Sequence, residues 1–77
     1  MEDREVIVYV SNNCVDSNRV LSTLDELDVS YVKKNTSENK EFMKELQKQM
    51  IYSTPTIIFG ATKILGFQKD RIRRFLG

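Results

Sequence analysis

The sequence has one cysteine, Cys14, and neither histidine nor tryptophan among its 77 residues. One thiol cannot close an intramolecular disulfide, so no covalent framework supports the fold. Zinc sites in proteins need several Cys or His ligands, so these shortages nearly exclude an all-protein zinc site. The lack of histidine also removes the usual general base and with it a Cys-His dyad of the protease type.

Long apolar runs are missing as well. The chain begins with the charged, largely acidic "MEDRE", and its longest apolar run is only a few residues. A signal peptide needs a basic start and a longer apolar stretch, and a membrane helix needs roughly 20 apolar residues. We therefore expect a cytoplasmic protein that does not bind membranes, with residues 1–77 forming a single domain.

The net charge of +1 is unevenly distributed. Residues 1–28 hold seven acids and two bases, whereas residues 29–77 hold four acids and ten bases. The tail "KDRIRRFLG" carries much of this excess, and a basic tail can bind phosphate backbones. No aromatic interleaving or base-reading motif accompanies it, so we favour cations that complement the dipole of a last helix, with no nucleic-acid partner.

The first half of the chain shows a strand-helix-strand pattern. Residues 4–10, "REVIVYV", are β-branched and aromatic with little polar alternation, which predicts a strand buried on both faces. Residues 15–27 carry one helical stripe, and residues 29–35 alternate as a strand. The stripe consists of Val20, Leu21, Leu24 and Leu27.

The second half predicts a helix, two strands and a last helix. Ser37 and Glu38 are plausible cap residues for a helix with Phe42, Met43, Leu46 and Met50 on its inner face. Strand formers follow the only proline, Pro55, and a turn at Gly60 leads into residues 61–65. Residues 68–76 then form a short helix whose inward residues are Ile72, Phe75 and Leu76.

The resulting order is β-α-β-α-β-β-α. A βαβ unit places its strands parallel with a right-handed crossover, and the later hairpin adds an antiparallel strand. We therefore expect an α/β protein with a four-stranded mixed sheet flanked by three helices. The residues expected to be mostly buried are Val6, Val8, Leu21, Leu24, Phe42, Leu46, Ile57 and Phe59.

Cys14 lies at the carboxyl end of the first predicted strand, where the first helix begins. Open α/β sheets place their sites at such ends. Free backbone N–H groups and the positive helix end stabilise an anion, so the pKa of this thiol should be lowered. A thiolate is the nucleophile in disulfide exchange. The alternative is an inert buried cysteine.

At these residues the chain resembles the glutaredoxins, small members of the thioredoxin fold, over essentially its whole length. The similar segments are "VIVYVSNNCVDS", "STPTIIF" and "LGF". Val15 after the cysteine, together with "GF", looks closest to the glutaredoxin-like redoxins that feed electrons to ribonucleotide reductase.

The resemblance implies a thiol-disulfide site without a tightly bound cofactor. Cys14 would be the attacking sulfur, in an active-site loop with Asn13, Val15, Asp16 and Ser17. Pro55 would be a cis-proline facing Cys14, and Thr54 would offer its backbone to glutathione or another thiol acting as co-substrate. Gly66 and Phe67 would line the same groove. From the residues alone, Pro55 can simply start a strand and Phe67 can be plain core.

Three residues or motifs depart from the family pattern. Ser17 stands where a resolving cysteine often is, so a mixed disulfide on Cys14 needs an external thiol for release. Ser11 replaces a lysine that pairs with the thiolate, and Asp16 adds a negative charge, so only a moderate pKa depression is expected. "LGF" replaces the Gly-Gly pair that often shapes the glutathione site.

Three functions are compatible with this sequence. The first is a monothiol oxidoreductase acting on small thiols and disulfide-bearing proteins, monomeric or joined as a disulfide-linked dimer on oxidation. The second is a non-catalytic module of the thioredoxin fold that binds an extended peptide. The third and weakest is an iron–sulfur cluster carrier, because the loop reads Cys-Val-Asp-Ser rather than the Cys-Gly-Phe-Ser of cluster-carrying relatives.

Overall fold

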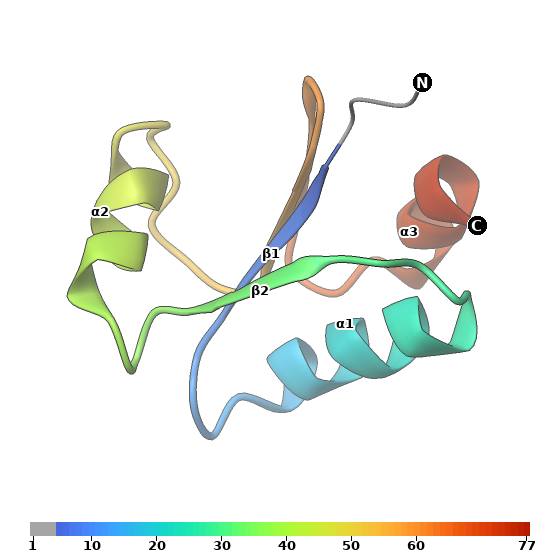
Figure 1. Cartoon of the computed structure of the whole chain (residues 1–77), viewed down its shortest axis with the longest axis horizontal. Helices are drawn as coiled ribbons and strands as arrows, with labels where there is room; N and C mark the ends of the chain where they lie inside the picture. Colours follow the sequence, from blue (N-terminus) through green and yellow to red (C-terminus); the bar gives the residue numbers. More distant parts are fainter. Residues whose placement is uncertain (1–4) are drawn as a thin grey trace.

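The computed structural model of the chain describes residues 5–77 and has the predicted order of elements (Figure 1). The strands form one mixed sheet in the order β2-β1-β3-β4. β1 pairs parallel with β2 and antiparallel with β3, and β3 pairs antiparallel with β4. The expected thioredoxin-like fold class is therefore confirmed. The elements are β1 (Val6–Val10), α1 (Val15–Glu26), β2 (Val32–Asn35), α2 (Lys40–Gln47), β3 (Thr56–Phe59), β4 (Thr62–Leu65) and α3 (Lys69–Leu76).

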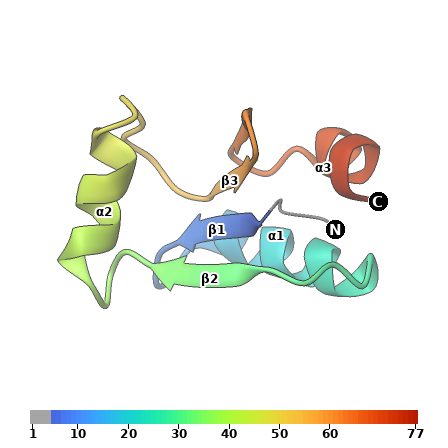
Figure 2. The same ribbon diagram turned by 45° about the horizontal axis from the view of Figure 1, so that its top comes forward.

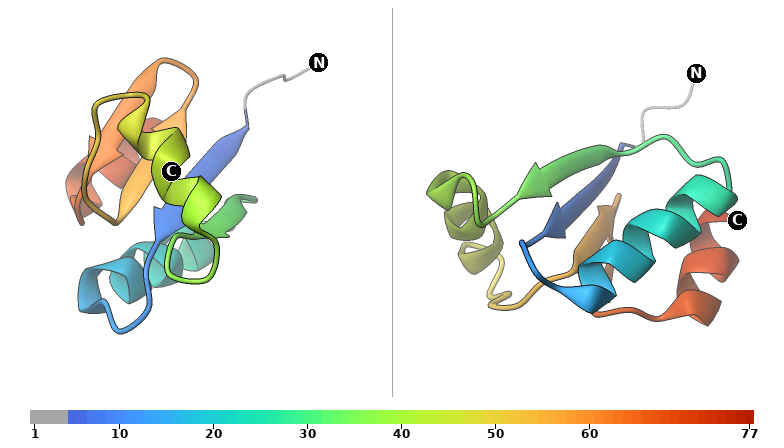
Figure 3. Two further views of the ribbon diagram at one scale, coloured as in Figure 1. Left: turned by 90° about the vertical axis from the view of Figure 1, so that its left-hand side faces the viewer. Right: turned by 90° about the horizontal axis from the view of Figure 1, so that it is seen from below.

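The helices cover both faces of the sheet. α2 lies on one side, while α1 and α3 lie together on the other (Figures 2 and 3). Successive side chains of a strand point to opposite faces of the sheet, so neighbouring residues of β1 pack against different helices. Val8 packs toward α1 and α3, whereas Tyr9 packs toward α2. As predicted, β1 is a central strand covered on both faces.

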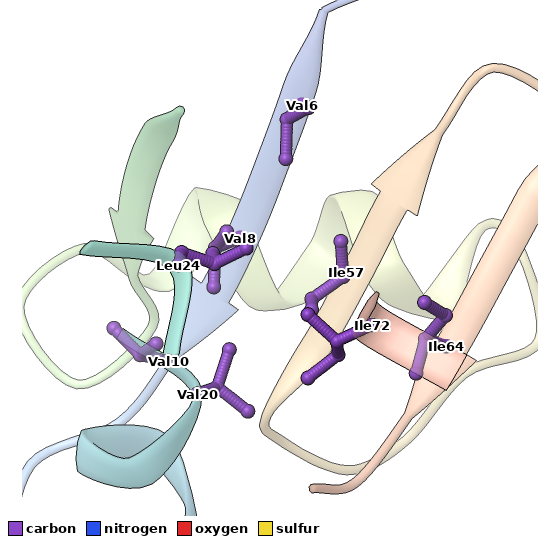
Figure 4. Close-up of a cluster of buried hydrophobic side chains, with 8 residues drawn as sticks. All are labelled: Val6, Val8, Val10, Val20, Leu24, Ile57, Ile64 and Ile72. Atoms are coloured by element: carbon purple, nitrogen blue, oxygen red, sulfur yellow. The ribbon is translucent and has the colours of Figure 1, made fainter. Parts of the chain in front are cut away.

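The larger core cluster lies between the sheet and the pair of helices α1 and α3 (Figure 4). Each fully buried aliphatic side chain of this kind contributes about 1.5–3 kcal/mol relative to an exposed one. Of the eight residues expected to be mostly buried, Leu21, Phe42 and Phe59 are only half-buried and pack at the margins of the two clusters. The buried residues of the cluster are Val6, Val8, Val10, Val20, Leu24, Ile57, Ile64 and Ile72.

Two element boundaries differ from the sequence prediction. The second strand begins at Val32 rather than at residue 29, because the chain leaves α1 through Asp28 at φ 58° and the Val29 N–H still bonds to the Leu24 carbonyl. The start of the first predicted strand at Arg4 lies outside the described residues. At α2 the cap is Asn39, whose side chain accepts the Glu41 N–H at 2.9 Å, and not Ser37 or Glu38.

Two residues expected to point inward are exposed. Met50 follows the end of α2 at φ 62° and leaves 76% of its surface open, so it does not continue the inner face of that helix. Phe75 is 42% exposed, with the Arg71 guanidinium 5.7 Å from its ring centroid. Ile72 is the buried contact of α3 instead.

Candidate active site

Cys14 is itself the N-cap residue of α1. Its backbone is extended (φ −116°, ψ 112°), and its sulfur accepts the backbone N–H of Ser17 at 3.4 Å. This is the bond that a serine or aspartate oxygen usually supplies at a helix start. The thiol is half-buried. A sulfur in this position meets the free N–H groups of a 12-residue helix, the environment that favours a thiolate.

The loop before Cys14 is held by side-chain hydrogen bonds. Asn13 has φ 56°, a left-handed conformation that asparagine adopts more readily than most residues. The Asn12 N–H donates to the Ser37 hydroxyl at 2.9 Å, and the Asn35 amide donates to the Asn12 side-chain oxygen at 2.9 Å. These bonds tie the loop to the β2–α2 connection and so fix where α1 starts.

Ser17 is a buried residue with only 1% of its surface exposed. Its hydroxyl accepts the backbone N–H of Ser11 at 3.3 Å, while its own N–H donates to the Cys14 sulfur. The residue that stands in the place of a second cysteine therefore also connects the strand end to the helix start.

The Thr54–Pro55 peptide bond is cis, as predicted. Pro55 is fully buried and immediately precedes β3, whose Thr56 pairs with Tyr9 of β1. The start of β3 and the carboxyl end of β1 therefore meet at one edge of the sheet, beside the start of α1 (Figure 3). The hydroxyls of Thr54 and Ser11 are 2.8 Å apart, which joins this segment to the Cys14 loop.

Gly66 and Phe67 lie next to this segment. The Gly66 N–H donates to the Pro55 carbonyl at 2.8 Å. Gly66 has φ +76°, and a Cβ built there would meet no atom within 4 Å, so the space over it is open. Phe67 is half-buried against the larger core cluster and also lines a groove, but Cys14, Thr54, Pro55 and Gly66 do not line that groove.

That groove has a volume of about 400 Å³ and runs along α1. Val15, the residue after Cys14, lines it and is 64% exposed. The other lining residues are Asn18, Arg19, Ser22, Thr23, Glu26, Phe67 and Lys69. An exposed apolar side chain on this groove therefore belongs to the residue next to Cys14 in the chain.

Hydrogen bonds lower the pKa of the Cys14 thiol. The largest cause is the Ser17 side chain, followed by the Ser17 backbone N–H. Partial burial acts in the opposite direction, and the Ser11 hydroxyl and the Asp16 backbone lower the pKa further. The lowered pKa agrees with the position of Cys14 at a helix start. The side chains that lower it are the hydroxyls of Ser17 and Ser11.

From its negative charge alone, Asp16 is expected to limit the lowering of the Cys14 pKa. Within residues 5–77, no charged side chain is among the causes of the Cys14 shift. The Asp16 carboxylate lies 3.8 Å from the Arg19 guanidinium, and both side chains are exposed. Asp16 therefore acts as a first-turn helix acid.

Ser11 is the site residue whose contribution sequence reasoning missed. The sequence marks it only as a position without lysine, whereas the structure places its hydroxyl against Thr54 and among the groups that lower the Cys14 pKa. Its location directly after the first strand and three residues before Cys14 was the available signal, since side chains at strand ends share the sheet edge with the site.

Among residues 5–77, no helix has the length and apolar character needed to cross a bilayer. The same residues contain no group of three or more His, Cys, Asp and Glu side chains arranged to hold a metal ion.

Comparisons with solved structures place the fold among thioredoxin-like proteins. The thioredoxin-like protein BC3987 superposes with a TM-score of 0.88 at 23% identity, covering 94% of this chain and 100% of that one. NrdH-redoxin from Escherichia coli, a glutaredoxin-like protein, gives 0.85 at 22% identity, covering 95% and 96%. The glutaredoxin grx-1 of Archaeoglobus fulgidus gives 0.76 at 20% identity, covering 94% and 85%. At these identities the likeness shows a shared fold.

Sequence comparison gives the family. No curated protein matches the chain. The glutaredoxin family, however, matches residues 6–64, which is more than half of the 77 residues and includes Cys14, Thr54 and Pro55. The protein therefore belongs to the glutaredoxin family.

Proposed function

We propose that the protein is a monothiol thiol-disulfide oxidoreductase in which Cys14 is the nucleophile. Membership in the glutaredoxin family supports thiol-disulfide exchange in general, since such proteins act on thiols and disulfide-bearing proteins. The observation that carries the monothiol mechanism is the position of the only sulfur nucleophile, which caps α1 and accepts the Ser17 N–H. The likeness to NrdH-redoxin, which has a thioredoxin-like activity profile, supports the same class of chemistry.

The first step is attack of the Cys14 thiolate on one sulfur of a disulfide. A new S–S bond forms between Cys14 and that sulfur, the original S–S bond breaks, and the other sulfur leaves as a thiolate that takes a proton from water. The leaving thiolate carries away the electron pair that the broken bond held. Cys14 is then oxidised as a mixed disulfide.

An external thiol completes the cycle. When Cys14 carries glutathione, a second glutathione thiolate attacks the glutathione sulfur, releases the Cys14 thiolate and forms oxidised glutathione. Ser17 cannot take this role because its hydroxyl cannot form a disulfide. A protein with one thiol suits a reducing compartment such as the cytoplasm, where small thiols are abundant.

The remaining site residues would hold the substrate. Thr54 would present backbone groups to an extended thiol ligand beside the cis-proline Pro55, and the open space over Gly66 would admit the ligand's main chain. Val15 and Phe67 would contact apolar parts of the ligand, while Asn13, Asp16 and Ser17 would shape the loop that holds the sulfur. Glutathione is the small thiol that we propose as co-substrate, with no tightly bound cofactor.

Turnover of a glutathione mixed disulfide tests this proposal. The mixed disulfide of glutathione with 2-mercaptoethanol is supplied with reduced glutathione, and formation of oxidised glutathione is followed with glutathione reductase. We expect catalysis by the wild-type protein and none by Cys14→Ser. A wild-type rate equal to that of Cys14→Ser would overturn the proposal and leave a non-catalytic binding module.

A further inference from the structure

The groove beside α1 starts at the residue after Cys14 and continues to the end of that helix, on the side of the sheet where α1 and α3 lie together (Figure 3). Val15, Arg19, Ser22 and Glu26 form its wall on α1, at the spacing of one helical stripe. At 1.5 Å per residue this wall is about 16 Å long. An extended peptide advances about 3.3 Å per residue, so the groove accommodates roughly five residues.

The groove is separate from the residues that surround the sulfur. Cys14, Thr54, Pro55 and Gly66 do not line it, and Val15 connects it to Cys14 along the chain. Glutathione joined to Cys14 has only one residue on either side of its own cysteine. The chain of a protein disulfide continues on both sides and can therefore reach along α1. A groove of this length favours a protein substrate over glutathione.

Charge changes sign along the groove. Arg19 lies about one turn from Val15, and Glu26 lies about two turns beyond Arg19, at the end of α1. Lys69 adds a second cation from α3 and has no ion-pair partner among residues 5–77. The Arg19 guanidinium is 3.8 Å from the Asp16 carboxylate, and both side chains are exposed. Exposed pairs of this kind are weak, so Arg19 remains available to another carboxylate.

The rest of the lining is apolar or small. Val15 is 64% exposed, and Phe67 is half-buried, so both can contact an apolar side chain. Ser22 stands between Arg19 and Glu26 on the stripe and is exposed. A small side chain at this position leaves room for the main chain of a bound segment.

We propose that this groove binds the segment that flanks the reactive cysteine of a protein disulfide. It selects segments with an acidic residue close to that cysteine and a basic residue about three positions further on. The acidic side chain pairs with Arg19 and Lys69, and the basic one pairs with Glu26, about 10 Å further along the helix. The inference rests on the proposed function of Cys14 and names the class of protein substrate that the site takes.

Two peptides of identical composition test this charge pattern. Each has a central cysteine and symmetric flanks, so that either chain direction can enter the groove. The first, Lys-Ser-Ser-Glu-Leu-Cys-Leu-Glu-Ser-Ser-Lys, has its acids near the cysteine. The second, Glu-Ser-Ser-Lys-Leu-Cys-Leu-Lys-Ser-Ser-Glu, has its bases there.

Each peptide is supplied with its cysteine joined to thionitrobenzoate through a disulfide. The Cys14 thiolate attacks the peptide sulfur and forms a new S–S bond. Thionitrobenzoate leaves as a coloured thiolate with the electron pair of the broken bond, because thiols of lower pKa leave faster. The rate is divided by that of 2-mercaptoethanol with the same peptide, which removes differences in intrinsic reactivity. We expect the first peptide to react faster, on the order of fivefold at low salt, and the difference to shrink at high salt.

Exchanging the charges of the groove should exchange this preference. In Arg19→Glu/Glu26→Lys the second peptide should become the faster one, and the ratio of the two rates does not depend on the thiolate fraction of Cys14. Glu41→Lys/Lys44→Glu, which exchanges an exposed ion pair on α2 across the sheet, should keep the wild-type preference. If thermal unfolding shows that the double variant does not fold, Glu26→Lys alone should weaken the preference, since a cation is favourable at the end of a helix.

Ser22→Trp tests whether the groove is occupied at all. The larger side chain at this exposed position should slow both peptides while turnover of the glutathione mixed disulfide stays near the wild-type rate. Equal normalised rates for the two peptides with wild type would overturn the proposal. An unchanged preference in Arg19→Glu/Glu26→Lys would also overturn it.

Binding without chemistry separates this inference from the proposed function. Cys14→Ser protein is titrated with both peptides, each with serine in place of cysteine, and the amide signals of Val15, Ser22 and Lys69 are followed by NMR. The first peptide should bind more tightly. If Cys14 fails to exchange and this preference holds, the proposed function is wrong and the groove stands. If the glutathione mixed disulfide is turned over and the two peptides neither bind nor react differently, the groove is wrong and the proposed function stands.

Discussion

At the scale of single residues, the Cys14 sulfur is stabilised by neutral groups. It accepts the Ser17 N–H, and the hydroxyls of Ser17 and Ser11 lower its pKa, with no contribution from a charged side chain of residues 5–77. Many relatives with a lysine at the position of Ser11 would obtain part of the same effect from charge. Direct hydrogen bonds at a half-buried sulfur are screened by salt much less than an exposed ion pair.

The pKa of Cys14 should therefore depend weakly on ionic strength. We expect nearly superimposable alkylation profiles from low salt to about 1 M salt, where the Debye length falls to about 3 Å. Arg19→Gln, which removes the charge nearest to Asp16, should also leave the profile in place. A pKa that rises steadily with salt would show that distant charges hold the thiolate.

Ser17→Cys should create a dithiol site. The Ser17 backbone N–H is 3.4 Å from the Cys14 sulfur, and the two residues lie one helical turn apart, within the separation that a disulfide can span. Mild oxidant should close an internal disulfide, seen as protection of both thiols from alkylation without a glutathione adduct. Ser22→Cys, about two turns along α1 from Cys14, should not close one. An oxidised Ser17→Cys variant in which both thiols still react would contradict the placement of the loop.

At the scale of elements, α2 is capped by Asn39 and not by Ser37 or Glu38, the two residues that the sequence favoured. The Asn39 side chain accepts the Glu41 N–H, whereas the Ser37 hydroxyl instead accepts the Asn12 N–H. The Asn35 side chain accepts the N–H groups of Ser37 and Glu38 in the preceding turn. Three polar residues close together can each cap a helix, so local sequence alone does not select among them.

Asn39→Ala should lower the free energy of unfolding by about 1 kcal/mol, the usual cost of losing an N-cap side chain. Glu38→Ala, at an exposed position that does not cap the helix, should change it by less than about 0.5 kcal/mol. Urea unfolding of the two variants compares these costs. Equal losses, or a larger loss in Glu38→Ala, would show that α2 begins earlier than Asn39.

α2 is also held to the sheet by a polar cluster. The Glu45 carboxylate accepts the Tyr9 hydroxyl at 2.8 Å and the Lys34 ammonium at 2.9 Å. The Lys34 bond and then the Tyr9 bond lower the pKa of Glu45, while burial and the Glu45 bond raise the pKa of Tyr9 to about 12. The cluster joins β1, β2 and α2, so it reports on how this helix sits on the sheet.

The pH dependence of stability follows from the lowered pKa of Glu45 and the raised pKa of Tyr9. Because the folded pKa of Glu45 is lowered, its contribution is complete above the unfolded value of about 4.3 and is lost as the pH falls through the lower folded value. The Tyr9 contribution is complete below the unfolded value of about 10 and is lost as the pH rises through about 12. Urea unfolding at several pH values should show a smaller acid loss in Glu45→Gln than in wild type, and a smaller alkaline loss in Tyr9→Phe. Parallel curves for all three proteins would contradict this account.

At the scale of the whole molecule, apolar periodicity was enough to predict the order of elements, the mixed sheet and its two covered faces. Two of the departures from the prediction lie where a backbone turn interrupts the pattern. Asp28 and Met50 adopt positive φ, which delays β2 and turns Met50 outward. Positive φ at a residue other than glycine depends on tertiary contacts, so periodicity does not predict it.

Part of the candidate site could also be predicted from the sequence. Cys14 at a strand end and the Thr54–Pro55 bond follow from position and from family resemblance. The contact between the Ser11 and Thr54 hydroxyls does not, because it joins residues 43 positions apart and depends on how the β1 and β3 ends meet. The same holds for Ser17, where the sequence shows a missing cysteine and not a hydroxyl that bonds to the Ser11 backbone.

The reactivity of Cys14 toward oxidised glutathione tests the central claim most directly. The protein is treated at neutral pH with oxidised glutathione, analysed by mass spectrometry, then treated with reduced glutathione and analysed again. The account predicts one glutathione adduct on Cys14 that the second treatment removes, with an alkylation pKa below the ~8.5 of a free thiol. No adduct, together with an alkylation pKa of about 9 or higher, would contradict it and leave Cys14 without a role in thiol exchange.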